Sequence, residues 1–114
     1  MITIYHNPRC RKSREGLAVV AASNAPYKVV EYLKNELSAT QIAALLSKLD
    51  MSAIDLVRKG EAIWKEQYKG RQLNEQQIIE AMATHPKLIE RPIVVKGDKA
   101  VVGRPLENIV TLLK

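Results

Sequence analysis

The sequence predicts an α/β protein in which a single domain, residues 1–114, contains a four-stranded mixed sheet. Three observations predict this class. The first third of the chain alternates two β-branched runs with an amphipathic segment, the middle carries helical patterns only, and the last third holds a hairpin signal followed by another amphipathic segment. A chain of 114 residues is long enough to bury a core without disulfides or metal ions.

A β-α-β unit is predicted at the start of the chain. Ile2–Tyr5 is a short β-branched run typical of a buried strand, and the His-Asn-Pro sequence at 6–8 ends it. The pattern from Cys10 to Ser23 is helical, Asn-Ala-Pro at 24–26 stops it, and Tyr27–Tyr32 forms a second strand. The crossover predicts that the two strands run parallel. The apolar side chains on the predicted inner face of this helix are Leu17, Val20 and Ala21.

The middle of the chain predicts helices. Ser38 is a suitable N-cap for a helix whose apolar residues follow the i, i+3, i+4, i+7 spacing. A short helical turn is expected over Ala53–Val57. Residues Arg58–Leu73 are polar and predict an irregular segment with one helical turn at Ala62–Gln67. The apolar stripe that follows Ser38 consists of Ile42, Leu45, Leu46 and Leu49.

A second well-marked helix precedes the last third of the chain. Asn74 and Gln77 have the spacing of a capping box, in which each side chain bonds the backbone N–H of the other residue. The helix should end before Pro86, and His85 is expected to close the helix rather than to bind anything. Its apolar positions are Ile78, Ile79 and Met82.

The last third of the chain predicts a hairpin and a final helix. Ile93–Val95 and Ala100–Val102 are two β-branched runs separated by the Lys-Gly-Asp-Lys turn at 96–99. Pro105 suits the first position of the helix that follows. The buried stripe of that helix should be Leu106, Ile109, Val110 and Leu113.

The order of these elements is β-α-β, a helical insert, then β-β-α. Together they predict an α/β thioredoxin-like fold, a four-stranded mixed sheet with helices on both faces. Because one fold of this kind hosts many unrelated activities, the function has to be argued from particular residues.

Composition limits the classes of partner. The formal net charge of +6 and the isoelectric point near 9.6 favour anionic partners. With four Tyr, one Trp and no Phe, the chain lacks the aromatic platforms on which single-stranded nucleic acid stacks, so nucleic acid is disfavoured. The early apolar run Leu17–Ala22 is far too short to cross a bilayer, and we expect no membrane association.

Cysteine and histidine usage predicts a cytoplasmic protein without metal. Cys10 is the only cysteine, so no internal disulfide can form, and a single free thiol is unusual in a secreted protein. His6 and His85 are the only histidines, and no cluster has metal-ligand spacing. We therefore expect no metal site, no bound cofactor and a monomeric chain.

The segment around Cys10 predicts a reactive thiolate. Cys10 falls at a strand-to-helix junction, where unpaired backbone N–H groups and the helix dipole favour negative charge. Four of the six residues from Arg9 to Arg14 are basic. Such surroundings lower a cysteine pKa from about 8.5 to roughly 3.5–7.5. His6 either orients the thiolate or serves as a capping or core histidine.

The spacing of Cys10 and Ser13 is that of a dithiol redox motif whose second cysteine is replaced by a hydroxyl. Ser13 can donate a hydrogen bond to a thiolate, but it cannot resolve a disulfide. Turnover must therefore recruit an external thiol, such as glutathione or glutaredoxin.

Four segments together carry a family resemblance. They are Ile-Tyr-His-Asn-Pro-Arg-Cys at 4–10, Leu-Val-Arg-Lys at 56–59, His-Pro-Lys-Leu-Ile-Glu-Arg-Pro-Ile-Val-Val at 85–95 and Gly-Arg-Pro at 103–105. The sequence resembles the glutaredoxin-dependent arsenate reductases, a thioredoxin-like family that also includes the Spx-type transcriptional regulators. The resemblance extends over essentially the whole chain.

The resemblance implies arsenate reduction, the activity of an arsenate reductase (glutathione/glutaredoxin). In this family a cysteine forms a thiol ester with arsenate, glutathione attacks that adduct and glutaredoxin assists the release of arsenite. Matched motif by motif, the nucleophile is Cys10, and the three arginines that hold the oxyanion are Arg58, Arg91 and Arg104. Guanidinium groups suit that task because they bind oxyanions in a bidentate manner.

Further positions are expected to support the site. The resemblance places His6 at the histidine before the nucleophile, and Pro92 at the cis-proline that thioredoxin-like folds hold beside the active cysteine. We therefore expect a cis Arg91–Pro92 bond. The remaining supporting residues are Asn7, Ser13 and Arg14.

A second class of function remains open. Arg11 and Lys12 stand where arsenate reductases of this family carry small uncharged residues, and the basic run resembles the Spx-type branch. The alternative is a redox-responsive regulator that binds RNA polymerase or another protein partner. The absence of a second cysteine weakens this alternative.

Overall fold

The computed structural model describes all residues, 1–114, and the chain divides into two compact units. The first unit comprises Met1–Asn35 and Arg91–Lys114, and the second comprises Glu36–Glu90. The expectation of a single domain stays a prediction. No helix has the length and apolarity needed to cross a membrane.

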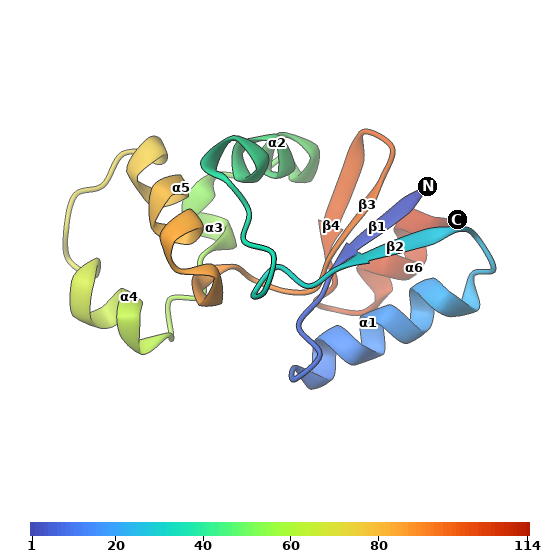
Figure 1. Cartoon of the computed structure of the whole chain (residues 1–114). Coiled ribbons are helices and arrows are strands. Elements are labelled where there is room, and N and C mark those ends of the chain that lie inside the picture. Colours follow the sequence, from blue (N-terminus) through green and yellow to red (C-terminus); the bar gives the residue numbers. More distant parts are fainter. The chain divides into compact units, whose positions relative to one another are not determined.

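The first unit is built on the predicted four-stranded mixed sheet (Figure 1). Its strands are β1 (Ile2–Tyr5), β2 (Tyr27–Val30), β3 (Ile93–Lys96) and β4 (Lys99–Val102), in the spatial order β2-β1-β3-β4. β1 pairs with β2 in parallel, as the crossover predicts, and β3 is antiparallel to both β1 and β4. The two-residue turn between β3 and β4 contains Gly97, whose φ of 65° favours glycine.

Two helices cover one face of this sheet. α1 (Arg11–Ala22) packs on β1, α6 (Glu107–Leu113) packs on β3 and β4, and the two helices contact each other. β3 is buried on both of its faces, as expected for a central strand of a layered α/β fold. The core residues between the sheet and these helices are Ile2, Ile4, Val20, Val94 and Ile109.

Three details of these helices differ from the predictions. Val110, expected in the buried stripe of α6, is exposed, and Ile109 is the residue of α6 that is buried. Ala21, expected on the buried face of α1, is exposed, and Gly16 is buried there with Val20. α1 turns the face that carries Gly16 toward Pro92 and Ile109, because the lack of a side chain at Gly16 lets the helix come close to these residues. Pro105, expected as the first helical residue of α6, lies before the helix, because Leu106 is the N-cap and Glu107 begins the first turn.

The second unit is helical, as predicted. Its elements are α2 (Ala39–Leu49), α3 (Ala53–Leu56), α4 (Ala62–Gln67), α5 (Glu75–Thr84) and a 3₁₀ turn, η1 (Pro86–Leu88). Ser38 caps α2 and Asn74 caps α5, each within a reciprocal capping box. α5 packs against α2, α3 and η1. The predicted stripe of α2 is buried.

Glycine at position 16 is required by packing. A Cβ added there would lie 2.8 Å from Cγ of Pro92 and 2.9 Å from Cδ1 of Ile109. The space around Gly103 is equally restricted, since a Cβ added there would lie 2.6 Å from the same Ile109 atom. These two glycines let α1 and the end of β4 approach Pro92 closely.

We predict that Gly16→Ala lowers the free energy of unfolding by about 1–3 kcal/mol, because the added methyl group overpacks the core. The sign of this change is informative, since replacing glycine by alanine inside a helix would otherwise raise the free energy of unfolding by about 1 kcal/mol. Urea denaturation measures the effect. Gly60→Ala is the matched control, because no atom lies within 4 Å of its added Cβ, and we expect little change there. A stabilised Gly16→Ala variant would contradict the packing described here.

Candidate active site

The candidate nucleophile, Cys10, lies at the junction of β1 and α1. It is the N-cap of α1, with extended backbone angles, and its side chain is partly exposed. The N–H of Cys10 donates to the Asn7 carbonyl at 3.0 Å, and the Cys10 carbonyl accepts the Arg14 N–H at 3.0 Å. The thiol therefore stands over the free N–H groups of the first helical turn, where negative charge is favoured.

The loop before Cys10 is fixed by two predicted supporting residues. Asn7 accepts the Arg9 N–H on its Oδ1 at 3.0 Å, and Arg14 donates from Nη1 to the Pro8 carbonyl at 3.0 Å. Both side chains hold the backbone of the loop. Asn7 and Arg14 thus support the position of Cys10 through the loop that carries it.

Sheet register brings two arginines from distant parts of the chain to this junction. Tyr5, the last residue of β1, pairs with Ile93, the first residue of β3, and Ile93 also pairs with Val102, the last residue of β4. Arg91, just before β3, and Arg104, just after β4, consequently lie at the same edge of the sheet as the end of β1.

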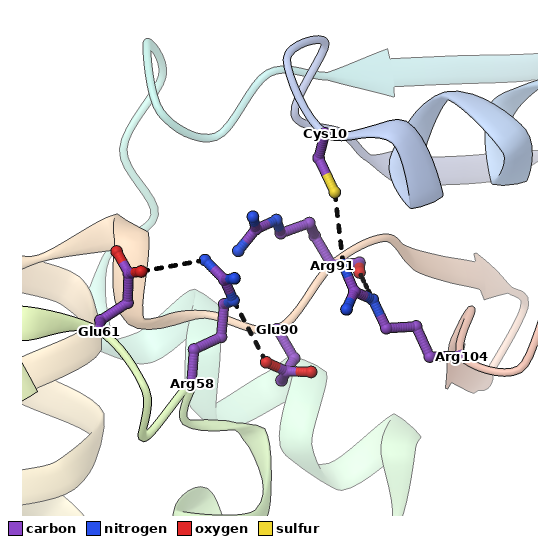
Figure 2. Close-up of polar contacts among 6 residues, drawn as sticks. All are labelled: Cys10, Arg58, Glu61, Glu90, Arg91 and Arg104. Atoms are coloured by element: carbon purple, nitrogen blue, oxygen red, sulfur yellow. Dashed lines mark hydrogen bonds and ion pairs between the residues drawn. The ribbon is translucent and has the colours of Figure 1, made fainter.

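Arg104 contacts the sulfur directly (Figure 2). Its Nη2 lies 3.4 Å from Sγ of Cys10, and its Nε donates to the Arg91 carbonyl at 3.0 Å. The second bond orients the guanidinium group toward the thiol. Arg91 carries a buried Nε that has no hydrogen-bond partner, so the site retains an unused donor.

The pKa of the Cys10 thiol is lowered from its ordinary value. Partial burial raises this pKa, but several groups together outweigh that effect by stabilising the thiolate. They are the backbone N–H of Ser13, the guanidinium group of Arg91, through a hydrogen bond and its charge, and the backbone N–H of Lys12. The site therefore favours the nucleophilic form of the sulfur.

The basic run from Arg9 to Arg14 contributes less than the sequence predicts. The side chains of Arg9, Arg11, Lys12 and Arg14 are exposed, and none of their charges is among the causes of the lowered Cys10 pKa. Solvent screens exposed charges. The positive charge that acts on the sulfur comes from distant positions, because Arg91 lowers the Cys10 pKa and Nη2 of Arg104 lies 3.4 Å from Sγ.

Ser13 and His6 form a buried pair beneath the nucleophile. Nδ1 of His6 lies 2.7 Å from Oγ of Ser13, which also accepts the Asn7 N–H at 3.0 Å. The Ser13 hydroxyl is thus engaged with His6, whereas the Ser13 backbone N–H stabilises the thiolate. His6 is 5% exposed and serves the site through Ser13.

The pKa of His6 is lowered. Burial lowers it most, the negative charge of Glu31 and a hydrogen bond with Ser13 raise it, and the positive charge of Arg14 lowers it further. In the neutral tautomer protonated on Nε2, Nδ1 accepts a hydrogen bond from the Ser13 hydroxyl.

Pro92 joins the site to the core. The Arg91–Pro92 bond is cis, which confirms the prediction, and the Arg104–Pro105 bond is cis as well. Pro92 is fully buried, and its carbonyl accepts the Gly103 N–H at 2.8 Å. This bond ties the segment that carries Arg91 to the segment that carries Arg104.

The third predicted oxyanion ligand, Arg58, belongs to the second unit. Its guanidinium group is held there by two carboxylates, with Nη1 3.4 Å from Oε2 of Glu61 and Nε 3.4 Å from Oε1 of Glu90 (Figure 2). In the first unit Cys10, Arg91 and Arg104 meet, while Arg58 is paired within its own unit.

Sequence reasoning missed the two glutamates that pair with Arg58. Glu61 lies three residues after Arg58, a spacing at which opposite charges commonly meet, so that pair was accessible from the sequence. Glu90 lies 32 positions later, and its pairing depends on a backbone bridge between Val57 and Ile89 that no local pattern reveals.

Comparisons with known proteins identify the same family by a family model and by individual relatives. The model of the ArsC family matches residues 5–112. The arsenate reductase of Neisseria meningitidis serogroup B is 39% identical over 114 residues, which cover 98% of this chain and 97% of the relative. The uncharacterized protein YfgD of Escherichia coli K12 is 42% identical over 98% of this chain and 96% of its own length.

Solved structures agree with the sequence relatives. The arsenate reductase from Vibrio cholerae superposes with a TM-score of 0.92 at 39% identity, covering 96% of this chain and 95% of that one. The predicted thioredoxin-like architecture, a four-stranded mixed sheet with helices, is thereby confirmed.

Burial of neutral His6 predicts a pH-dependent stability. Because the His6 pKa is lowered from 6.5 by folding, the unfolded chain binds more protons below about pH 6.5. The free energy of unfolding should therefore fall as the pH drops through 6.5 toward the folded pKa. Urea denaturation from pH 8 to pH 5 should show a smaller fall for His6→Gln than for wild type. Equal falls in the two proteins would contradict this account of His6.

Proposed function

The chain belongs to the ArsC family, and from this premise we propose that it is an arsenate reductase in which the Cys10 thiolate attacks arsenate. The observation that carries the proposal is the contact of 3.4 Å between Nη2 of Arg104 and Sγ of Cys10, beside the unpartnered Nε of Arg91. A thiolate and an oxyanion are both negative and repel each other. Two guanidinium groups offset that repulsion and orient the substrate.

The proposed first step forms a bond between Sγ of Cys10 and arsenic. One As–O bond breaks, and its oxygen leaves as water after protonation, so arsenic remains As(V) in the thiol ester. Arg91 and Arg104 bind the remaining oxygens through their guanidinium groups. Holding both reactants in place removes much of the entropic barrier.

The proposed second step needs another thiol. Because Cys10 is the only cysteine, the attacking thiolate comes from outside the chain, and glutathione is the reductant we propose. The glutathione sulfur forms a bond to Sγ of Cys10, and the Sγ–As bond breaks. The electron pair of the broken bond stays on arsenic, which is thereby reduced from As(V) to As(III) and leaves as arsenite. Glutaredoxin then exchanges with the mixed disulfide on Cys10 and restores the thiolate.

Supporting roles follow from the contacts. His6 and Ser13 hold the backbone N–H of Ser13 toward the thiolate, and Asn7 and Arg14 hold the preceding loop. Arg58 is proposed as a third oxyanion ligand because the Leu-Val-Arg-Lys motif matches the family.

One observation favours a second candidate, a regulator that binds a protein partner. The side chains of Arg9, Arg11, Lys12 and Arg14 are exposed. Reversal of two of these charges, in Arg11→Glu and Lys12→Glu, separates the candidates. Loss of RNA polymerase from a pull-down with unchanged arsenite production would support the regulator. Absence of polymerase from the wild-type pull-down would count against it.

We predict that Cys10→Ser reduces arsenite production with glutathione and glutaredoxin to background, because a hydroxyl is not ionised at neutral pH.

Arg104→Lys keeps the charge but loses the planar donor group, and its kcat/KM should fall roughly tenfold to a hundredfold. Arg71→Lys is the matched control, since that exposed guanidinium group lies outside the site and donates to the carbonyl of Gln67, the last residue of α4. Wild-type turnover no faster than that of Cys10→Ser would refute the proposal.

A further inference from the structure

Arg58 and its two glutamates form a compact ion cluster, which we call the Arg58 triad (Arg58, Glu61 and Glu90). Both nitrogen–oxygen distances are 3.4 Å, one to Glu61 and one to Glu90. The three side chains are 26%, 30% and 27% exposed, so the triad is largely removed from water. Its charges are therefore screened less than those of a fully exposed pair.

Backbone hydrogen bonds fix the three residues relative to one another. The Arg58 N–H donates to the Leu88 carbonyl at 2.7 Å, and the Glu90 N–H donates to the Leu56 carbonyl at 2.9 Å. The Glu61 N–H donates to the Arg58 carbonyl at 3.1 Å, and Glu61 is the N-cap of α4. The two carboxylates are thus held beside the guanidinium group by the backbone of the second unit.

The triad does not present a free cation. One guanidinium group and two carboxylates sum to a net charge of −1, which repels an incoming anion. Nη1 and Nε of Arg58 already face carboxylate oxygens, so any bidentate contact between an oxyanion and this guanidinium group uses at least one nitrogen that is already paired. The cost of separating a partly buried pair is then subtracted from the binding free energy of the oxyanion.

We propose that Glu61 and Glu90 set the affinity of this protein for its oxyanion, because a bidentate contact of the substrate with Arg58 has to displace a carboxylate from Nη1 or Nε. This inference rests on the proposed function, specifically on Arg58 as an oxyanion ligand. Glu61 and Glu90 act through Arg58 and are positioning residues. They weaken substrate binding and leave the chemistry at Cys10 unchanged.

The inference makes a distinctive kinetic prediction. Removing one carboxylate by Glu61→Gln or Glu90→Gln should lower the KM for arsenate roughly threefold to tenfold, because the triad becomes neutral and one guanidinium edge is freed. The value of kcat should stay within about twofold, since neither glutamate contacts the sulfur. Higher salt should reduce the difference.

A direct binding measurement does not depend on turnover. In a Cys10→Ser background, calorimetric titration with arsenate and with inorganic phosphate should give Kd values that fall by the same factor in Glu61→Gln and Glu90→Gln. Glu66→Gln is the matched control, an exposed glutamate of α4, and should leave Kd unchanged. Adding Arg58→Ala should abolish the gain from either glutamine variant, since there is then no guanidinium group to release.

The outcomes separate this inference from the proposed function. Unchanged Kd and KM in both glutamine variants of a protein that reduces arsenate would overturn the inference and leave the function intact. A gain that persists after Arg58→Ala would also overturn it, because the glutamates would then act by general repulsion. Tighter oxyanion binding in a protein without arsenite production would support the triad and refute the proposed function.

Discussion

The stabilised thiolate of Cys10 is the interaction on which the rest of the site depends. A partly buried sulfur would resist ionisation, and the site reverses that tendency with backbone N–H groups of the first turn of α1 and with a guanidinium group. The buried His6–Ser13 pair holds the backbone beneath the sulfur, and the bond from Arg104 to the Arg91 carbonyl holds the arginines beside it. These contacts position the groups that surround the sulfur of Cys10.

The sheet explains why these groups meet. β1 and β4 end, and β3 begins, at the same edge, because Tyr5 and Val102 both pair with Ile93. A nucleophile after β1 therefore lies near residues just before β3 and just after β4. The close packing of Gly16 and Gly103 on Pro92 brings α1 and the end of β4 against the segment that carries Arg91. The packing that stabilises the core is thus the packing that positions the chemistry.

Much of the fold could be predicted from the sequence. β-branched runs, the N-cap Ser38 and the capping box at Asn74 are local signals, and they located the strands and the helices α2 and α5. The buried face of α1 was partly missed, because the close approach of Gly16 to Pro92 is a tertiary contact that periodicity does not encode.

The sequence located Cys10 at a helix N-terminus from local features, and the guanidinium groups around its sulfur come from distant parts of the chain. The neighbouring basic residues suggested a local source of positive charge, whereas the sheet register brings the guanidinium groups of Arg91 and Arg104 to the sulfur. Of the two carboxylates beside Arg58, that of Glu90 could not be predicted from the sequence, since Glu90 reaches the arginine only across a backbone bridge.

The pKa of Cys10, measured by the pH dependence of alkylation with and without arsenate, tests the central claim most directly. The account predicts a pKa clearly below the value of about 8.5 for a free cysteine, and slower alkylation when arsenate is present. A pKa near that of free cysteine, with a rate of alkylation that arsenate does not change, would contradict it.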